Sequence, residues 1–235
     1  MASWLLVAAL AAVLGSSGGS APKSLADAEG ARWRTPLCVG VSGLNPTNAQ
    51  YVVDRISQRA AQFGIRAGAP GCAANLLIVF SADPSGQARA IARERSDPAS
   101  VTGVSGQTAG LSAFNAFVTS TAPVRWWRVV QPLSDRGEVV SRNNRLGEAP
   151  RVNVDERGRL RATVRDGFSH VIVIVDLAQV NGVRLEALSD YLALVGLAPV
   201  EEPDAAGASI LGLFSGAEVQ RMSPSDEDFL REVYR

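Results

Sequence analysis

The clearest hydrophobic pattern in the chain is an unbroken apolar run, 171–175, which is closed by Asp176. A continuous run of this length is typical of a strand that is buried on both faces. After the turn residues 181–182, a second apolar pattern with helical spacing begins near Arg184 and continues to Leu197. Together the two patterns predict a central strand that leads into a helix.

Nearer the N-terminus, the apolar spacing predicts a strand, a helix and a second strand in succession. Residues 37–44 form the first strand, and Asn45 and Pro46 supply the cap and the first residue of the helix. The helix ends at Gly64, and its apolar stripe consists of Ala49, Val52, Val53, Ile56, Ala60 and Phe63. The apolar run within 75–81 then predicts a parallel strand, so the unit is a right-handed βαβ crossover.

Weaker patterns predict the remaining elements. A second helix runs from Asp83 to about Arg95, and a strand spans 124–131. Apolar and polar residues alternate over 151–164, which predicts a solvent-facing hairpin. The final helix begins at Ser223, a capping serine that is followed by proline. Segment 98–112 is rich in Ser, Thr and Gly, which predicts an exposed connection.

The order of these elements predicts an α/β fold, in which a mixed, largely parallel sheet is flanked by helices. A chain of 235 residues with 46% hydrophobic residues fits one such domain. We expect a signal peptide over residues 1–21, a polar segment over 22–36 and a single domain over 37–235.

Residues 4–14 form an apolar run of 11 residues, followed by small residues as far as Ala21. The run is shorter than the ~20 residues of a membrane span, and this pattern predicts a cleaved signal peptide. The missing Lys or Arg ahead of Trp4 departs from that pattern, and the alternative is a helix that packs on the domain. We expect a periplasmic or secreted protein with no membrane span after cleavage.

Cys38 and Cys72 are the two cysteines of the chain. An even number in an oxidising compartment favours a disulfide, and both positions lie near the beginnings of neighbouring predicted strands. Two buried free thiols are the alternative. The wide spacing disfavours a redox or zinc site.

The formal net charge is zero, so no long-range field attracts the chain to nucleic acid or to an anionic membrane. We therefore expect no nucleic-acid partner, and binding of an anion requires a local patch. All of the 23 basic residues except Lys23 are arginine, which fits a coding bias more simply than a role in anion recognition. One local basic group consists of Arg157, Arg159, Arg161 and Arg165. This group either binds a phosphate or an acidic partner, or it forms a solvated face.

Several kinds of enzyme are disfavoured because their residues are missing. His170 is the single histidine, whereas zinc sites built on histidine use two or three. Segments 40–44 and 167–171 both lack the final glycine of the Gly-x-Ser-x-Gly nucleophile elbow. The sequence also lacks a phosphate-binding Gly-x-x-x-x-Gly-Lys and a dinucleotide-binding glycine motif. We expect neither a metal nor a cofactor.

Three polar residues remain as catalytic candidates: His170, Asp176 and Asp190. His170 and Asp176 stand at opposite ends of the predicted strand, roughly 20 Å apart, so they do not form a direct pair. Asp176 lies at the carboxyl end of the strand, where α/β sheets bind ligands, or it caps the following turn. Trp126 and Trp127 are the binding candidates, because neighbours on a strand face opposite sides and one of them can be exposed.

Three C-terminal segments resemble a family of uncharacterised secreted bacterial proteins that are similar to zincin-like metalloprotease domains; these segments are 188–197, 209–214 and 223–234. The resemblance covers about the last 70 residues. Family members carry a His-Glu-x-x-Gln or Glu-Glu-x-x-Gln helix that ends in Gly-Leu. Aligned on 196–197, Ser189 and Ala193 occupy the ligand positions and Asp190 the glutamate position. Serine and alanine do not ligate zinc, so the resemblance implies a zincin scaffold without its metal.

The sequence therefore predicts an exported, non-catalytic binding or structural component of the cell envelope, with another envelope protein as a candidate partner. The alternative is a degenerate or unusual peptidase-like hydrolase that uses Asp176 and Asp190 in a cleft below segment 98–112. That mechanism requires the two carboxylates to lie within about 10 Å of each other. A third hypothesis is an assembly partner that docks through Trp126 or Trp127.

Overall fold

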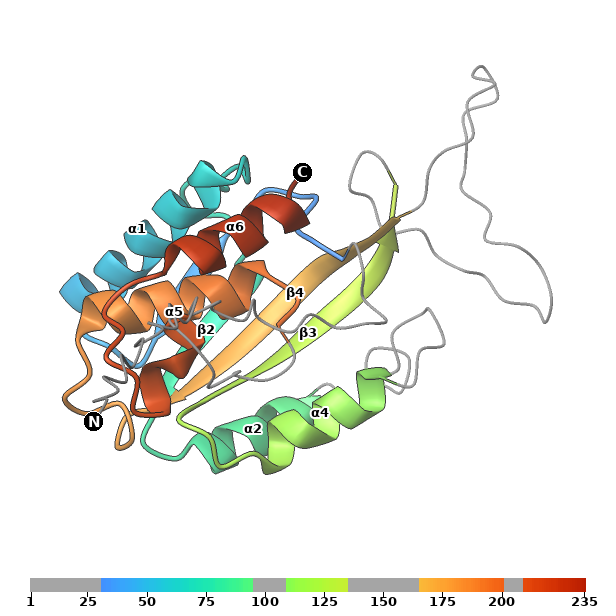
Figure 1. The fold of residues 1–235 in the computed structure, drawn as a ribbon. Coiled ribbons are helices and arrows are strands. Elements are labelled where there is room, and N and C mark those ends of the chain that lie inside the picture. Colours follow the sequence, from blue (N-terminus) through green and yellow to red (C-terminus); the bar gives the residue numbers. More distant parts are fainter. Residues whose placement is uncertain (1–30, 95–108, 135–164, 201–208) are drawn as a thin grey trace, which may run out of the picture.

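The computed structural model describes residues 31–94, 109–134, 165–200 and 209–235 (Figure 1). The predicted signal peptide, the predicted hairpin over 151–164 and most of segment 98–112 lie outside these residues. Within them, no helix is both long and apolar enough to cross a membrane.

A four-stranded sheet in the order β1-β2-β4-β3 forms the centre of the molecule. β1 (Val39–Ser42), β2 (Leu76–Ser81) and β4 (Arg165–Asp176) are parallel, and β3 (Val124–Leu133) is antiparallel to β4 at one edge. The predicted α/β class with a mixed, largely parallel sheet is confirmed, as is the parallel βαβ unit at its start.

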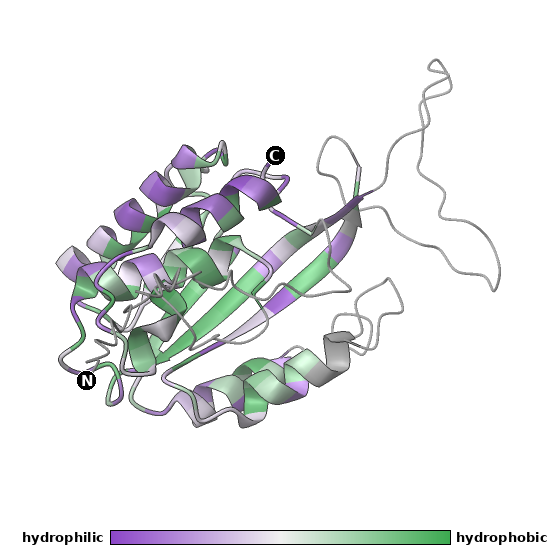
Figure 2. Cartoon of the chain, in the orientation of Figure 1, coloured by the Kyte–Doolittle hydropathy of each residue, from purple (hydrophilic) through white to green (hydrophobic). Residues whose placement is uncertain are grey.

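Helices cover both faces of the sheet (Figure 1). One face carries α1 (Pro46–Gln62), α5 (Leu185–Leu197), the 3-10 helix η2 (Ile210–Phe214) and α6 (Pro224–Val233), and the other carries α2 (Pro84–Glu94) and α4 (Ala109–Thr119). Figure 2 shows hydrophobic residues concentrated in the strands between these layers and hydrophilic residues on α1 and α6.

Two helix starts form as their cap sequences predict. The Asn45 side chain accepts the Asn48 N–H ahead of α1, and Pro46 opens that helix. Ser223 and Asp226 form a reciprocal capping box at the start of α6. These caps satisfy backbone N–H groups that have no partner inside the helix.

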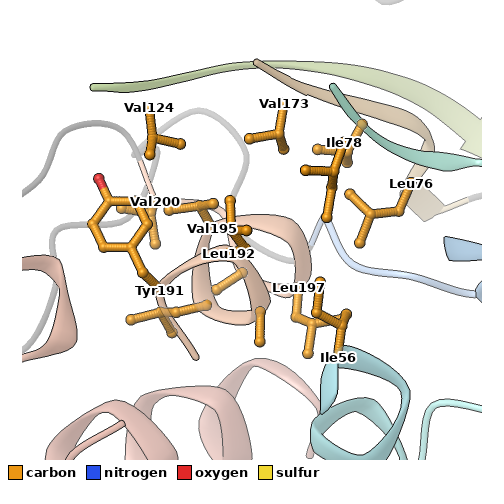
Figure 3. Close-up of a cluster of buried hydrophobic side chains, with 14 of the residues drawn as sticks. Ile56, Leu76, Ile78, Val124, Val173, Tyr191, Leu192, Val195, Leu197 and Val200 are labelled. Carbon is orange, nitrogen blue, oxygen red and sulfur yellow. The ribbon is translucent and has the colours of Figure 1, made fainter. Parts of the chain in front are cut away.

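The helix α5 lies in the core, and every residue from Ala187 to Leu197 is buried. Figure 3 shows side chains of α5 meeting those of the sheet, with Ile56 of α1 beside Leu197. The sequence predicts a helix from its apolar spacing, and the structure shows that α5 is buried on all sides from Ala187 onward. At its C-terminal end, Arg128 of β3 donates to the carbonyls of Val195 and Val200.

Three boundaries differ from the prediction. β4 begins at Arg165, well before its continuous apolar run, and α4 begins at Ala109, inside the segment expected to be exposed. Ala31 and Trp33, in the segment expected to be polar, are buried in the core. Trp33 packs edge-on against Phe168 of β4, and this contact attaches the segment before β1 to the core.

The sheet has a step at the amino end of β4. β2 pairs with β4 only from Val171 onward, whereas β3 continues to pair with β4 back to Arg165. Beside this longer part of β4, Arg32 forms a parallel bridge with Gly167, and the Phe168 N–H donates to the Arg32 carbonyl. The N-terminal segment therefore lies beside β4 where β2 is missing.

A disulfide joins Cys38 to Cys72, with a Cα–Cα distance of 6.1 Å, and confirms the predicted pairing. It connects the residue before β1 to the loop between α1 and β2. The same loop also pairs with the chain ahead of β1, through a parallel bridge between Leu37 and Ala67. The disulfide is compatible with a periplasmic or extracellular protein.

Candidate functional site

A cavity of about 480 Å³ lies at the step in the sheet. Its walls come from the N-terminal segment, the loop after α1, the outer ends of β3 and β4, and the end of α6. The described residues that line it are Arg32, Trp33, Arg34, Thr35, Phe63, Gly64, Ile65, Arg66, Ser134, Arg165 and Tyr234.

The charge of this lining is one-sided. It contains four arginines, and none of the described lining residues is Asp or Glu. In the part of the chain that the structure describes, the ion pairs of Arg55, Arg59, Arg184 and Arg231 lie elsewhere. Arginines grouped without carboxylates in a concave site favour binding of an anion.

Backbone carbonyls orient two of these arginines. The Nη1 group of Arg32 donates to the Val233 carbonyl at 2.9 Å and to the main-chain oxygen of Arg235 at 3.2 Å. The Nε group of Arg34 donates to the Asp166 carbonyl at 3.2 Å. Carbonyls hold a guanidinium in place without neutralising its charge, and each guanidinium has five N–H donors. Among the residues that the structure describes, Arg66 and Arg165 have no carboxylate partner, so their positive charge remains available to a ligand.

Aromatic residues on the inner side of the cavity are fixed in place. Trp33 is 4% exposed, and its indole Nε1–H donates to the Gly196 carbonyl at 2.8 Å. The Tyr234 hydroxyl donates to the Leu197 carbonyl at 2.6 Å, and burial raises the pKa of this hydroxyl. These bonds connect the cavity to the C-terminal end of the buried helix α5.

The wall that carries Arg66 is held by the disulfide region. The Leu37 N–H donates to the Arg66 carbonyl at 2.8 Å, and the Gly68 N–H donates to the Leu37 carbonyl at 2.7 Å. The Cys38–Cys72 bond joins the same two segments. Two walls of the cavity are therefore connected by hydrogen bonds and by a covalent bond.

Asp190 is fully buried and forms an ionic cluster between α5 and α1. Arg55 donates from Nε to Oδ1 at 2.8 Å and from Nη2 to Oδ2 at 3.1 Å, and Arg59 does the same at 3.0 and 2.7 Å. The Met222 N–H adds a fifth hydrogen bond at 2.9 Å. Burial alone raises the pKa of this carboxyl, but the bonds from Arg59 and Arg55 outweigh it and lower the pKa to about 2.

Asp176 lies at the carboxyl end of β4, as the sequence predicts. Its Oδ2 accepts from the Gln179 side chain at 2.7 Å, and its Oδ1 accepts from the Ala178 N–H at 2.9 Å. The hydrogen bond from Gln179 is the main cause of the lowered pKa of Asp176. These are the contacts of a residue that caps a turn, and they share no partner with Asp190.

The structure does not bring the other sequence candidates to the cavity. His170 is an exposed residue of β4 paired with Val129, and none of the three catalytic candidates lines the cavity. Trp127 is buried under α4 and contacts Phe114, whereas Trp126 on the opposite face of β3 is partly buried and donates to the Val200 carbonyl.

The positions aligned with the zincin motif are all in the interior of α5. Ser189 and Ala193 are fully buried, and the Ser189 hydroxyl donates to the Leu185 carbonyl at 2.7 Å. Among the described residues, no group of three or more His, Cys, Asp or Glu side chains is arranged to hold a metal ion.

The sequence offers a partial signal for the cavity. Arg32 and Arg34 alternate around Trp33, which is the spacing that puts two side chains on one face of an extended segment. Arg165 belongs to the predicted basic group, whose other members lie outside the described residues. No sequence pattern connects Arg66 to them, because only the folded chain brings the loop after α1 to this place.

Comparisons of the chain with models of protein families, with curated proteins and with solved structures found no match.

Proposed function

We propose that this chain is an exported, non-catalytic binding component of the cell envelope, periplasmic or secreted, which recognises an anionic ligand in the arginine-lined cavity. The observation that carries the proposal is the combination of four arginines and no Asp or Glu among the described residues around a space of about 480 Å³. Pockets of roughly 300 to 1,000 Å³ are typical of small-molecule sites.

The surroundings of the cavity support a binding role. Arg32 is held by the end of α6 and Arg34 by the start of β4, so the charged wall is organised before a ligand arrives. A site that is ordered in advance loses less conformational entropy on binding. The disulfide, which orders the wall with Arg66, fits an oxidising compartment outside the cytoplasm.

The positions of the carboxylates favour binding over hydrolysis. A general base must reach the proton that it removes, whereas Asp190 is fully buried and both of its oxygens accept hydrogen bonds from arginines. The resemblance of α5 to a zincin helix stays a prediction. The buried Ser189 and Ala193 support a structural role for this helix.

Thermal unfolding of the purified full chain tests the proposal. Phosphate and citrate are compared with chloride at constant ionic strength. Binding at a hundred times Kd adds about 2.7 kcal/mol of stability, which raises the Tm by about 5 °C or more for a protein of this size.

The double variant R66Q/R165Q is expected to lose this rise in Tm, because both exposed guanidinium groups are removed from the cavity. R184Q is the matched control, since Arg184 is also exposed but pairs with Glu186 away from the cavity. An equal rise in all three proteins, or no rise with either anion, contradicts the proposal.

A further inference from the structure

The charge around the cavity sets the charge of the ligand. Arg66 and Arg165 form no ion pair with any residue that the structure describes. One negative charge leaves most of this positive charge uncompensated inside a concave, partly desolvated space. A ligand with two negative charges matches it better.

The volume sets the size of the ligand. A water molecule takes about 30 Å³ of liquid, and a bare phosphate or sulfate ion is only a few times larger. Such an ion leaves most of the 480 Å³ to solvent. An organic molecule that carries the anionic group fills the space and removes more surface from water.

The lining offers an apolar surface for that organic part. Phe63 is half-buried at the end of α1 and lines the cavity, beside the buried Ile65. Arg165 comes from β4 and Arg66 from the same loop as Phe63, so cationic and apolar groups line one space. This combination distinguishes an organic anion from an inorganic one.

We propose that the cavity binds a small organic dianion, whose phosphate monoester or paired carboxylates contact Arg66 and Arg165 and whose apolar body contacts Phe63. A phosphate monoester and a dicarboxylate share this chemistry, because both present several oxygens to the planar N–H groups of arginine. The inference rests on the proposed function and narrows it to a class of ligand.

Isothermal titration calorimetry with four probes tests the inference on the full, oxidised chain. The probes are phenyl phosphate, phthalate, benzoate and inorganic phosphate, at equal ionic strength and above the second pKa of a phosphate ester, roughly 6. We expect phenyl phosphate or phthalate to bind at least about tenfold tighter than benzoate and inorganic phosphate, a difference of about 1.4 kcal/mol. Whichever of the two binds more tightly identifies the source of the dianion.

Two variants locate the contacts. R165Q is expected to raise the Kd of the preferred dianion about tenfold or more, whereas R184Q leaves this Kd unchanged. F63L is expected to weaken the binding of phenyl phosphate or phthalate more than the binding of inorganic phosphate, because only the organic probes contact the ring of Phe63. Since Arg165 is exposed, its replacement tests the proposal even if F63L disturbs the fold.

The outcomes separate the two proposals. Binding of benzoate or of inorganic phosphate as tightly as the best dianion overturns the inference and leaves anion binding intact. Dianion binding that is unchanged in R165Q overturns the assigned contacts. No measurable binding of any probe overturns both the inference and the proposed function.

Discussion

Asp190 shows how one side chain joins three parts of the molecule. It belongs to α5, it accepts from Arg55 and Arg59 of α1, and it accepts from the backbone of Met222 ahead of α6. Glu186 and Glu227 pair with the outer sides of the same two arginines. In this arrangement the charge is compensated inside the protein, so Asp190 stabilises the helical layer.

Replacing Asp190 with Asn removes the charge that compensates Arg55 and Arg59. Breaking a buried pair on one side typically destabilises by about 3 to 5 kcal/mol, and we expect D190N to lower the free energy of unfolding in urea by this amount. E186Q is the control, because Glu186 is 39% exposed and such pairs contribute at most about 1 kcal/mol. Equal, small losses in both variants contradict the structural role of Asp190.

The lowered pKa of Asp190 predicts how stability depends on pH. The ordinary pKa is 3.8 and the folded value is about 2, so the charged form is favoured by folding. The contribution is complete above the unfolded pKa and is lost as pH falls from about 4 to about 2, with a total of about 2 kcal/mol. Urea unfolding across this range should show that the difference in unfolding free energy between the native chain and D190N becomes smaller as the pH falls. A constant difference contradicts the prediction.

At the residue scale, the sequence predicts local contacts and misses long-range ones. The Asn45 cap and the Ser223 capping box involve residues within one turn of each other, so they are readable from the sequence. Arg59 is 8% exposed, yet on a predicted helix it resembles a solvated arginine. Its partner Asp190 is distant in the chain, and only the packing of α1 on α5 brings them together.

The crossover from β1 to α1 depends on a close approach of two strands. Gly43 has φ of +84°, and a Cβ there would lie 1.9 Å from the Phe80 carbonyl oxygen. Gly182 has nearly the same φ, +85°, but a Cβ there meets no heavy atom within 4 Å. Gly43 is therefore required for both its conformation and its contact, and Gly182 for its conformation alone.

These two glycines make a matched pair of variants. G182A is expected to destabilise by about 1 to 2 kcal/mol, the cost of a left-handed conformation for an L-residue. G43A is expected to lose about 1 to 3 kcal/mol more, because the strands must move apart. Urea denaturation of both variants measures the difference. Equal losses of unfolding free energy would contradict the prediction, because they would show that the close contact of Gly43 with Phe80 adds no cost.

The disulfide is expected to stabilise both the domain and the wall with Arg66. It closes a loop with a sequence separation of 34, for which the chain-entropy treatment gives roughly 3 to 4 kcal/mol. The variant C38S/C72S should lose this amount in urea unfolding, and the native chain in reductant should match it. A native chain whose unfolding midpoint does not respond to reductant would disprove the prediction.

At the element scale, the sequence predicts the segments that have a start signal or an apolar run, whereas it misses α4 and the first part of β4. α1, α2 and α6 have clear starts, and β2 is a continuous apolar run. α4 contains no charged residue, and its small and polar residues resemble a loop until Trp127 and Phe114 are seen to pack together. The first part of β4 is polar, because it lies beyond β2 and is only partly covered.

The whole molecule creates the cavity, and no single segment contains it. Arg32 and Arg34 precede the first strand, Arg66 follows α1, and Arg165 begins β4. Their grouping depends on the step in the sheet and on the loop fixed by Cys38 and Cys72. The net charge of zero hides this local concentration, which is why composition indicates no anion site.

The most direct test of the central claim is an NMR titration that observes the Nε–Hε groups of the arginine side chains while phenyl phosphate is added. The signals are assigned with single arginine variants. We expect those of Arg32, Arg66 and Arg165 to shift together and to saturate, whereas those of Arg184 and Arg231, which pair with carboxylates on the surface, stay in place. Saturable shifts confined to arginines outside the cavity, or no saturable shift at all, would contradict an anion-binding function for this site.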